Sequence, residues 1–118
     1  MKTLVIGVSE KPARYAYKAV VSLLKHGHEV VALAKMSGEV KGVEFETKHI
    51  EYKNIDTITL YINPQIQLAY YDYVVSLHPR RVIFNPGTEN SEFMDLLKQY
   101  DIEFVVACTL VMLSTNQF

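Results

Sequence analysis

Ser9, Lys11 and Arg14 follow Gly7 within one short stretch, directly after a run of apolar residues. Ser9 offers a hydroxyl group, while Lys11 and Arg14 bring two positive charges. The glycine allows backbone to approach a ligand closely, and the start of a helix after it would present unpaired N–H groups. These groups predict an anion site, best suited to phosphate, in which Arg14 binds two oxygens at once. The alternative is an ordinary strand-to-helix turn that carries two solvated basic residues.

The same stretch departs from the dinucleotide motif G-x-G-x-x-G, because Ser9 and Pro12 stand where the second and third glycines would fall. The next β-branched run ends in Ala34 and Lys35, where a nicotinamide-dinucleotide site would place an acidic residue for the ribose hydroxyls. Lys35 suits a phosphate on the ribose better than a free diol, although a solvated lysine is the commoner explanation. Recognition of NAD is therefore disfavoured.

Two further loops carry turn and capping residues. In the segment 84–90, Asn85 precedes the Pro86-Gly87 pair that ends a strand, and a turn followed by a helix cap explains it without any ligand. Asn63 precedes a proline, a pair that suits the start of a helix.

The elements that would position these residues alternate along the chain. Short apolar, β-branched runs predict five strands, at residues 4–8, 30–34, 57–62, 82–84 and 103–107. Apolar residues at helical spacing predict helices over about 13–26, 64–77 and 93–100.

The polar segment 35–56 is expected to be mostly loop, with one short strand or helical turn. The alternation implies parallel βαβ units. We expect an α/β fold over residues 1–118: a single Rossmann-like, doubly wound parallel sheet of five strands with helices on both faces. In such sheets a ligand lies beyond the carboxyl ends of the strands, so the loops described above would share one edge.

Composition narrows the possible partners. The chain has 118 residues, 49% hydrophobic, and its 12 basic and 13 acidic residues are spread along it, so no charged field exists for nucleic acid or a membrane surface. The longest apolar run, 104–113, is too short to span a bilayer, and no secretory signal is evident. The single cysteine, Cys108, cannot form an internal disulfide, and the four histidines lack metal-ligand spacing. We expect a cytoplasmic protein without a metal.

At this point the residues resemble a known family. Gly7–Arg14 resembles the motif G-A-S-x-x-P-x-R, matched at the glycine, serine, proline and arginine. This motif opens the small stand-alone CoA-binding proteins, whose domain is similar to the nucleotide-binding domain of the succinyl-CoA synthetase α subunit. The resemblance implies that Ser9 and nearby amides contact the phosphates of CoA and that Arg14 is a phosphate partner.

The resemblance extends over nearly the whole chain. Residues 40–42, 84–90 and 105–108 are similar to later segments of the family, whereas residues 33–35 depart from its V-N-P at the end of the second strand. The synthetases carry their phosphorylated histidine in a second domain. The resemblance therefore implies CoA binding without ligase chemistry in these 118 residues.

Our hypothesis is a protein that binds CoA or acyl-CoA and has no catalysis of its own, because no nucleophile, base and orienting group come together in the sequence. It would sense or carry the nucleotide or regulate a partner, which is either a second copy or an unknown protein. The expected binding residues are Gly7, Val8, Ser9, Lys11, Pro12, Arg14, Lys35, Asn63, Asn85, Pro86 and Gly87. The alternatives are an NADP-type oxidoreductase fragment and an interaction module that has kept the fold without the ligand.

Overall fold

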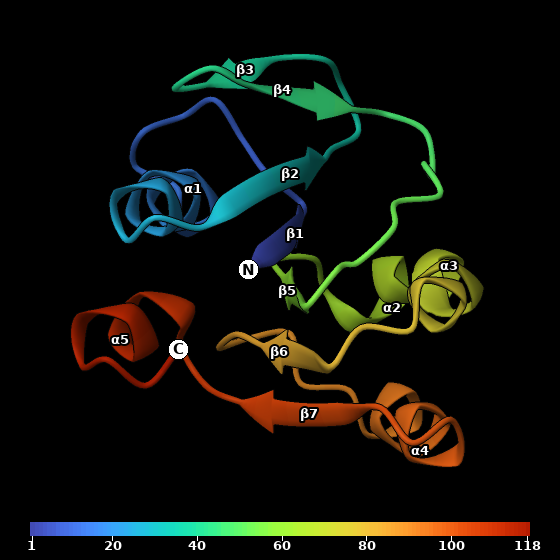
Figure 1. The fold of residues 1–118 in the computed structure, drawn as a ribbon. Coiled ribbons are helices and arrows are strands. Elements are labelled where there is room, and N and C mark those ends of the chain that lie inside the picture. Colours follow the sequence, from blue (N-terminus) through green and yellow to red (C-terminus); the bar gives the residue numbers. More distant parts are fainter.

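The structure, a computed structural model, describes residues 1–118 and contains one seven-stranded sheet in the order β3-β4-β2-β1-β5-β6-β7 (Figure 1). The strands are β1 Lys2–Ile6, β2 Glu29–Leu33, β3 Glu39–Val40, β4 Val43–Glu46, β5 Thr57–Leu60, β6 Arg81–Phe84 and β7 Glu103–Val106. All neighbours pair in parallel except the short edge strand β3. The six parallel strands have the order of a doubly wound Rossmann sheet, which reverses between β1 and β5.

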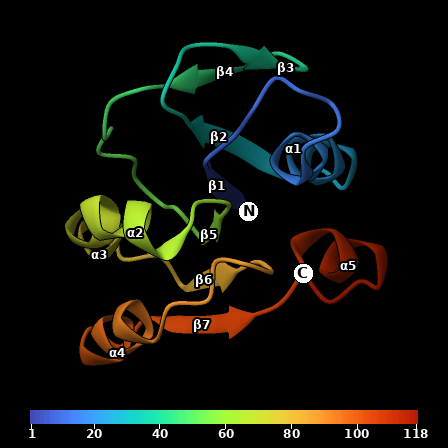
Figure 2. The same cartoon turned by 180° about the vertical axis from the view of Figure 1, so that it is seen from behind.

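Helices cover both faces of the sheet, as expected. The helical elements are α1 Tyr15–Lys25, α2 Pro64–Gln67, the 3-10 turn η1 Leu68–Tyr70, α3 Tyr71–Leu77, α4 Ser91–Gln99 and α5 Thr109–Ser114. Helices α1 and α5 lie on one face, and α2, α3 and α4 lie on the other (Figures 1 and 2). None of them has both the length and the hydrophobicity needed to cross a bilayer.

Side chains that alternate along the strands feed two separate cores. Leu4 and Ile6 of β1 join the cluster beneath α3 and α4, whereas Val5 joins the cluster beneath α1 and α5. Leu4, Val5 and Ile6 are all fully buried. Because both faces are covered, the central strands read in sequence as continuous apolar runs.

The five predicted strands are present as β1, β2, β5, β6 and β7, but the sheet has two more, because β3 and β4 lie in a segment expected to be mostly loop. Val40 and Phe45 are the buried side chains of these strands, at 2% and 8% exposure. Strands of two and four residues are too short to show a period. Lys41 and Gly42, with φ of 50° and 85°, form the two-residue turn that joins them.

The helix predicted over 64–77 is interrupted as well. The buried Gln67 side chain donates to the carbonyl oxygens of Ile62 and Thr88, both at 2.8 Å. Gln67 is the last residue of α2, and the 3-10 turn η1 separates α2 from α3. Helix α5 was not expected from the sequence, because its residues continue the apolar run of β7.

Candidate functional site

The loops that follow β1 and β5 meet where the strand order reverses. Gly7 has a φ of +94°, and its N–H donates to the Leu33 carbonyl at 2.9 Å. A Cβ at Gly7 would lie 2.8 Å from the Ile62 side chain and 2.9 Å from the Tyr61 carbonyl oxygen. Only glycine lets the two loops approach this closely.

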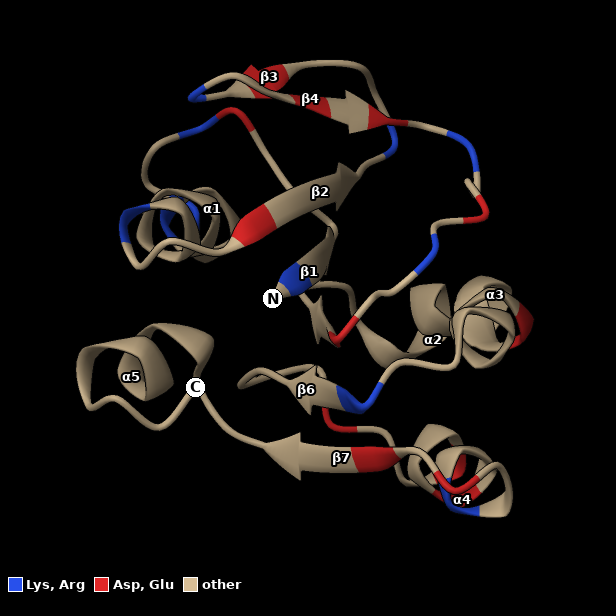
Figure 3. Cartoon of the chain, in the orientation of Figure 1, with Lys and Arg blue, Asp and Glu red and all other residues tan.

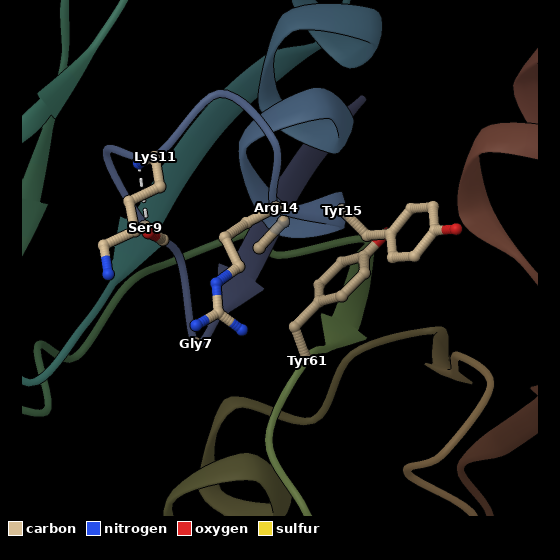
Figure 4. Close-up of a pocket in the computed structure, with 7 residues that line it drawn as sticks. Gly7, Ser9, Lys11, Arg14, Tyr15 and Tyr61 are labelled. Carbon is tan, nitrogen blue, oxygen red and sulfur yellow. Dashed lines mark hydrogen bonds between the residues drawn. The ribbon is translucent and has the colours of Figure 1, made fainter.

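A central cavity of about 360 Å³ opens beside this contact. It is lined by Gly7, Ser9, Lys11, Arg14, Tyr15, Ala16 and Tyr61. Figure 4 shows Arg14 reaching from the start of α1 toward Gly7, with Ser9 and Lys11 on one side of it and the two tyrosine rings on the other.

The loop between β1 and α1 has no side chain that caps the helix. Ser9 Oγ accepts from the Lys11 N–H at 3.1 Å, which folds the loop on itself. Arg14 occupies the N-cap position in extended conformation and makes no capping hydrogen bond. The first N–H groups of α1 therefore face the central cavity without a side-chain acceptor, beside the Arg14 guanidinium.

Three cations along this edge have no carboxylate partner. Lys11, Arg14 and Lys35 are exposed, and none forms an ion pair within 4.0 Å. The ion pairs of the chain instead join Lys2 to Glu29 and Arg80 to Asp56. Figure 3 shows that acidic and basic residues are otherwise scattered over the fold. The three unpaired cations lie at the edge of the sheet where an anion can be bound.

A second cavity of about 360 Å³, the Lys35 cavity, adjoins the first through Ser9 and Lys11. It is lined by Val8, Ser9, Glu10, Lys11, Ala34, Lys35, Met36, Ser37 and Phe45. The Glu10 carboxylate accepts from the Glu39 N–H at 3.0 Å, and a Cβ at Gly38 would lie 2.7 Å from the carboxyl carbon. Glu10 therefore ties the loop that carries Lys35 to the loop that carries Ser9.

A third cavity of about 200 Å³, the Cys108 cavity, adjoins the central one through Tyr15 and Tyr61. It is lined by Tyr15, Tyr61, Asn85, Pro86 and Cys108. The three cavities thus follow one another along the carboxyl edge of the sheet, from Phe45 to Cys108. Its lining of two aromatic rings, a proline and a thiol makes the third the most apolar of them.

Asn85 holds the floor of the Cys108 cavity in place. Its amide donates to Thr59 Oγ1 at 2.7 Å and to the Leu60 carbonyl at 2.8 Å, and its oxygen accepts from the Thr109 N–H at 2.9 Å. The residue is only 2% exposed. These bonds join the ends of β5 and β6 to the start of α5.

The Tyr61 hydroxyl is buried between the two cavities and the sheet. Burial raises the pKa of Tyr61 to about 12, so the phenol stays protonated at neutral pH. The hydroxyls of Thr59 and Thr109 lie close and favour ionisation, but they bond to each other at 2.8 Å and leave the phenol without a partner. Tyr61 is thus a neutral wall of the site.

The model of a family described as "CoA binding domain" matches residues 1–114. The chain belongs to the CoA binding domain family. None of the curated proteins compared with the chain matches it.

Solved structures share the fold of the chain. A crystal structure of an uncharacterized protein is 49% identical, with a TM-score of 0.97 over 99% of this chain and 97% of that one. A Thermus thermophilus protein is 23% identical, with a TM-score of 0.85 over 99% and 90% of the two chains. An acetyl-coenzyme A synthetase 1 from Ca. Korarchaeum cryptofilum is 15% identical, with a TM-score of 0.75 over 90% of this chain and 25% of the synthetase. The resemblance and the Rossmann-like fold are confirmed.

Within this CoA binding domain, most of the expected binding residues line the three cavities. Gly7, Ser9, Lys11 and Arg14 meet in the central cavity, and Val8 and Lys35 lie in the Lys35 cavity. Asn85 and Pro86 line the Cys108 cavity.

Three expected residues lie outside the three cavities. Asn63 caps α2, accepting from the Ile66 N–H at 2.9 Å, and its carboxamide oxygen is thereby engaged. Gly87 supplies a turn with φ of +90°, and Pro12 is exposed in the first loop. Their roles toward a ligand stay predictions.

Sequence reasoning missed other residues of these walls. Tyr15 and Tyr61 line two cavities each, and Met36 and Phe45 supply the apolar part of the Lys35 cavity. Tyr61 directly follows β5 at the switch point, and this position is the one sequence signal that indicates it. Phe45 lies on a strand too short to be recognised, and no signal pointed to it.

Proposed function

We propose that this CoA binding domain protein binds CoA, or an acyl-CoA, in the groove formed by the three cavities. The observation that carries the proposal is the set of three unpaired cations, Lys11, Arg14 and Lys35, around a helix start that lacks a side-chain cap. A polyanionic nucleotide satisfies all of them. CoA carries a pyrophosphate and a separate ribose phosphate, which matches a site with two cationic cavities.

The pyrophosphate is assigned to the central cavity. Arg14 can bind two phosphate oxygens with its planar fork, and the free N–H groups of α1 add the partial positive charge of a helix start. Gly7 keeps the backbone low enough for the phosphates to approach. Ser9, whose hydroxyl already accepts from the Lys11 N–H, can donate its proton to a phosphate oxygen.

The adenosine is assigned to the Lys35 cavity. Lys11 and Lys35 flank this space, where a ribose phosphate would be neutralised, and Met36 and Phe45 offer apolar surface to the base. A nucleotide with a free ribose diol gains nothing from Lys35. This difference favours CoA or NADP over NAD.

The pantetheine arm is assigned to the Cys108 cavity. A mostly apolar space walled by Tyr15, Tyr61 and Pro86 suits an uncharged chain better than a phosphate. CoA has such an arm beyond its pyrophosphate, whereas NADP has a second nucleotide. The apolar character of this cavity is the observation that favours CoA over NADP.

We further propose that residues 1–118 act as one binding unit in the cytoplasm, without catalysis of their own. Asn85 is committed to structural hydrogen bonds and Tyr61 is held neutral, so neither is poised to transfer a proton. A bound nucleotide would then be carried to, or sensed by, a partner, which is a second copy or another protein. The Cys108 cavity would present the thiol or acyl end near the start of α5.

Parallel calorimetric titrations of the purified protein with CoA, acetyl-CoA, dephospho-CoA, NADP and NAD test this function. We expect CoA and acetyl-CoA to bind more tightly than NADP, and dephospho-CoA and NAD to bind most weakly. Preference for NADP would favour an oxidoreductase fragment. No heat with any nucleotide, together with an unshifted melting temperature, would favour an interaction module without a ligand.

A further inference from the structure

A second group of polar side chains lies at the amino edge of the sheet, opposite the groove. Thr3 of β1, Thr57 of β5 and Arg81 of β6 are register neighbours on three adjacent strands and share one face. His28 precedes β2 by one residue, two positions before Val30, the register partner of Thr3. We call Thr3, His28, Thr57 and Arg81 the amino-edge cluster.

The amino-edge cluster contains three buried polar atoms that lack any hydrogen-bond partner: Thr3 Oγ1, His28 Nδ1 and Arg81 Nη2. Thr3 is fully buried. Arg81 Nε donates to Thr57 Oγ1 at 2.9 Å, which orients the guanidinium along this face. Buried polar atoms are nearly always satisfied, so three such atoms near one another require polar partners from outside the protein, either an ion or water.

Arg81 is the charged residue of the amino-edge cluster, so an anion is the ligand that suits it. The nearby carboxylate, Asp56, accepts from Arg80 at 2.9 and 3.0 Å and from the Thr57 hydroxyl at 2.7 Å. Burial and the neighbouring Arg80 lower the pKa of Arg81, and burial and the N-terminal amino group lower the pKa of His28. Asp56 and Glu103 favour the charged form of Arg81, but neither forms an ion pair with it within 4.0 Å.

The phenyl ring of Phe118 covers the amino-edge cluster. Its centroid lies 4.4 Å from the Arg81 guanidinium carbon and 4.9 Å from the His28 ring centroid. The ring offers its face to the Arg81 cation. It has no oxygen or nitrogen that could accept a hydrogen bond from the unpartnered atoms of the amino-edge cluster. Residues 114–117 before it are exposed, and Phe118 itself is partly exposed, so the ring can turn outward.

We propose that the amino-edge cluster is a binding site for a small oxyanion, a carboxylate or phosphate group, that takes the place of the Phe118 ring. Arg81 Nη2 and Thr3 Oγ1 donate to its oxygens, and His28 donates through Nδ1 in the tautomer that carries its proton there. This site is separate from nucleotide binding, because the groove lies at the opposite edge of the sheet.

NMR titration of the protein at neutral pH with inorganic phosphate, and separately with acetate, tests this proposal. The titrations are done with the Arg14→Ala variant, in which we expect phosphate to bind more weakly in the groove. We expect saturable shifts of the His28 and Phe118 ring signals with at least one of the two anions. Phe118→Ala removes the cover, and we expect about tenfold tighter binding, read from the His28 ring alone.

Two arginine variants decide whether Arg81 is the anchor. Arg81→Met keeps the length of the side chain without the charge, and we expect binding to weaken at least about tenfold. Arg80→Met is the matched control, because Arg80 is already paired with Asp56, and it should leave anion binding in place. Shifts that persist in Arg81→Met would overturn the assignment.

A titration without a saturable His28 shift would contradict the proposal. If neither the protein nor Phe118→Ala shows a saturable His28 shift with phosphate or acetate, the orphan atoms bind water alone and the proposal is wrong. The titration of Phe118→Ala still tests the proposal if Arg81→Met fails to fold. Titration with CoA reads a different edge of the molecule, so its outcome leaves this test unaffected.

Discussion

At the scale of single residues, Arg14 carries the largest expected share of ligand affinity. It is an exposed N-cap residue without a hydrogen-bond or ion-pair partner for its side chain, so its removal should leave the fold intact. We expect Arg14→Ala to weaken CoA binding by about 1.5–3 kcal/mol, as for other charge-assisted hydrogen bonds.

Calorimetric titration measures this loss, and the melting temperature checks the fold. Lys25→Ala is the control, because Lys25 lies in the last turn of the same helix, away from the groove. Arg14→Lys separates charge from geometry, since lysine keeps the charge and loses the planar fork. Equal affinity of the protein and Arg14→Ala would remove the phosphate assignment of this residue.

Gly7 is the residue on which the shape of the groove depends. Gly7→Ala would combine a positive φ with a Cβ within 3.0 Å of the Tyr61 and Ile62 atoms. Gly87→Ala is a matched control, because Gly87 has nearly the same φ, +90°, and open space around its Cα. We expect Gly87→Ala to cost about 1–2 kcal/mol of the free energy of unfolding from the backbone alone.

Gly7→Ala should cost about 1–3 kcal/mol more than Gly87→Ala, because the overlap with the Tyr61 backbone adds to the same backbone strain. Urea unfolding of the two variants measures the difference. Equal losses would mean that the two loops separate freely and that their contact does not define the central cavity.

At the scale of elements, the Glu10 carboxylate joins two loops that the sequence keeps far apart. Because it accepts from the Glu39 N–H, it fixes the segment between β2 and β3 that carries Lys35. We expect Glu10→Ala to release this segment and to reduce the ratio of CoA to dephospho-CoA affinity about threefold to tenfold, since Lys35 is then no longer held beside the ribose phosphate. This prediction rests on CoA binding.

The affinity ratio from paired calorimetric titrations is the readout, since a general loss of stability would weaken both ligands alike. Glu10→Gln serves as the control, because it removes the same negative charge from the Lys35 cavity while its amide oxygen can still accept from the Glu39 N–H. An unchanged ratio in Glu10→Ala would show that Lys35 is positioned without Glu10, or that it does not contact the ribose phosphate.

The elements also show what a sequence can and cannot reveal. The strand β1, the helix α1 and the loop between them follow from an apolar run, helical spacing and a motif, all of them local signals. The hairpin of β3 and β4 does not, because its burial depends on contacts with β2 and α1 rather than on its own period. Phe45, the wall that β4 adds to the Lys35 cavity, was missed for that reason.

At the scale of the whole molecule, the strand order explains why residues from distant segments share one groove. Five of the six parallel strands were predicted, and their carboxyl ends necessarily lie at one edge. The meeting of Gly7 with Tyr61 follows from the reversal between β1 and β5. The order itself, and the commitment of Asn63 and Asn85 to internal hydrogen bonds, depend on tertiary contacts that no local pattern contains.

The stability of the whole domain should depend on pH through Asp56, which lies directly before β5 and binds Arg80 directly before β6. The hydrogen bond from Arg80 lowers the pKa of Asp56 in the folded protein below its ordinary value of 3.8. A depressed carboxyl pKa contributes stability above the unfolded value, and this contribution is lost as the pH falls through the folded pKa.

We therefore expect urea unfolding to show a loss of stability as the pH falls through and below about 4, and Asp56→Asn to lose part of that dependence. The variant should be less stable than the protein at pH 7, and the gap should close at low pH, where the carboxylate is protonated in both states. Glu29→Gln is the control, because Glu29 pairs with Lys2 at 3.7 Å with 68% of its side chain exposed. A gap that stays constant with pH would mean that Asp56 acts through its shape and neutral hydrogen bonds, and that charge pairing at the amino edge of β5 and β6 adds nothing to folding.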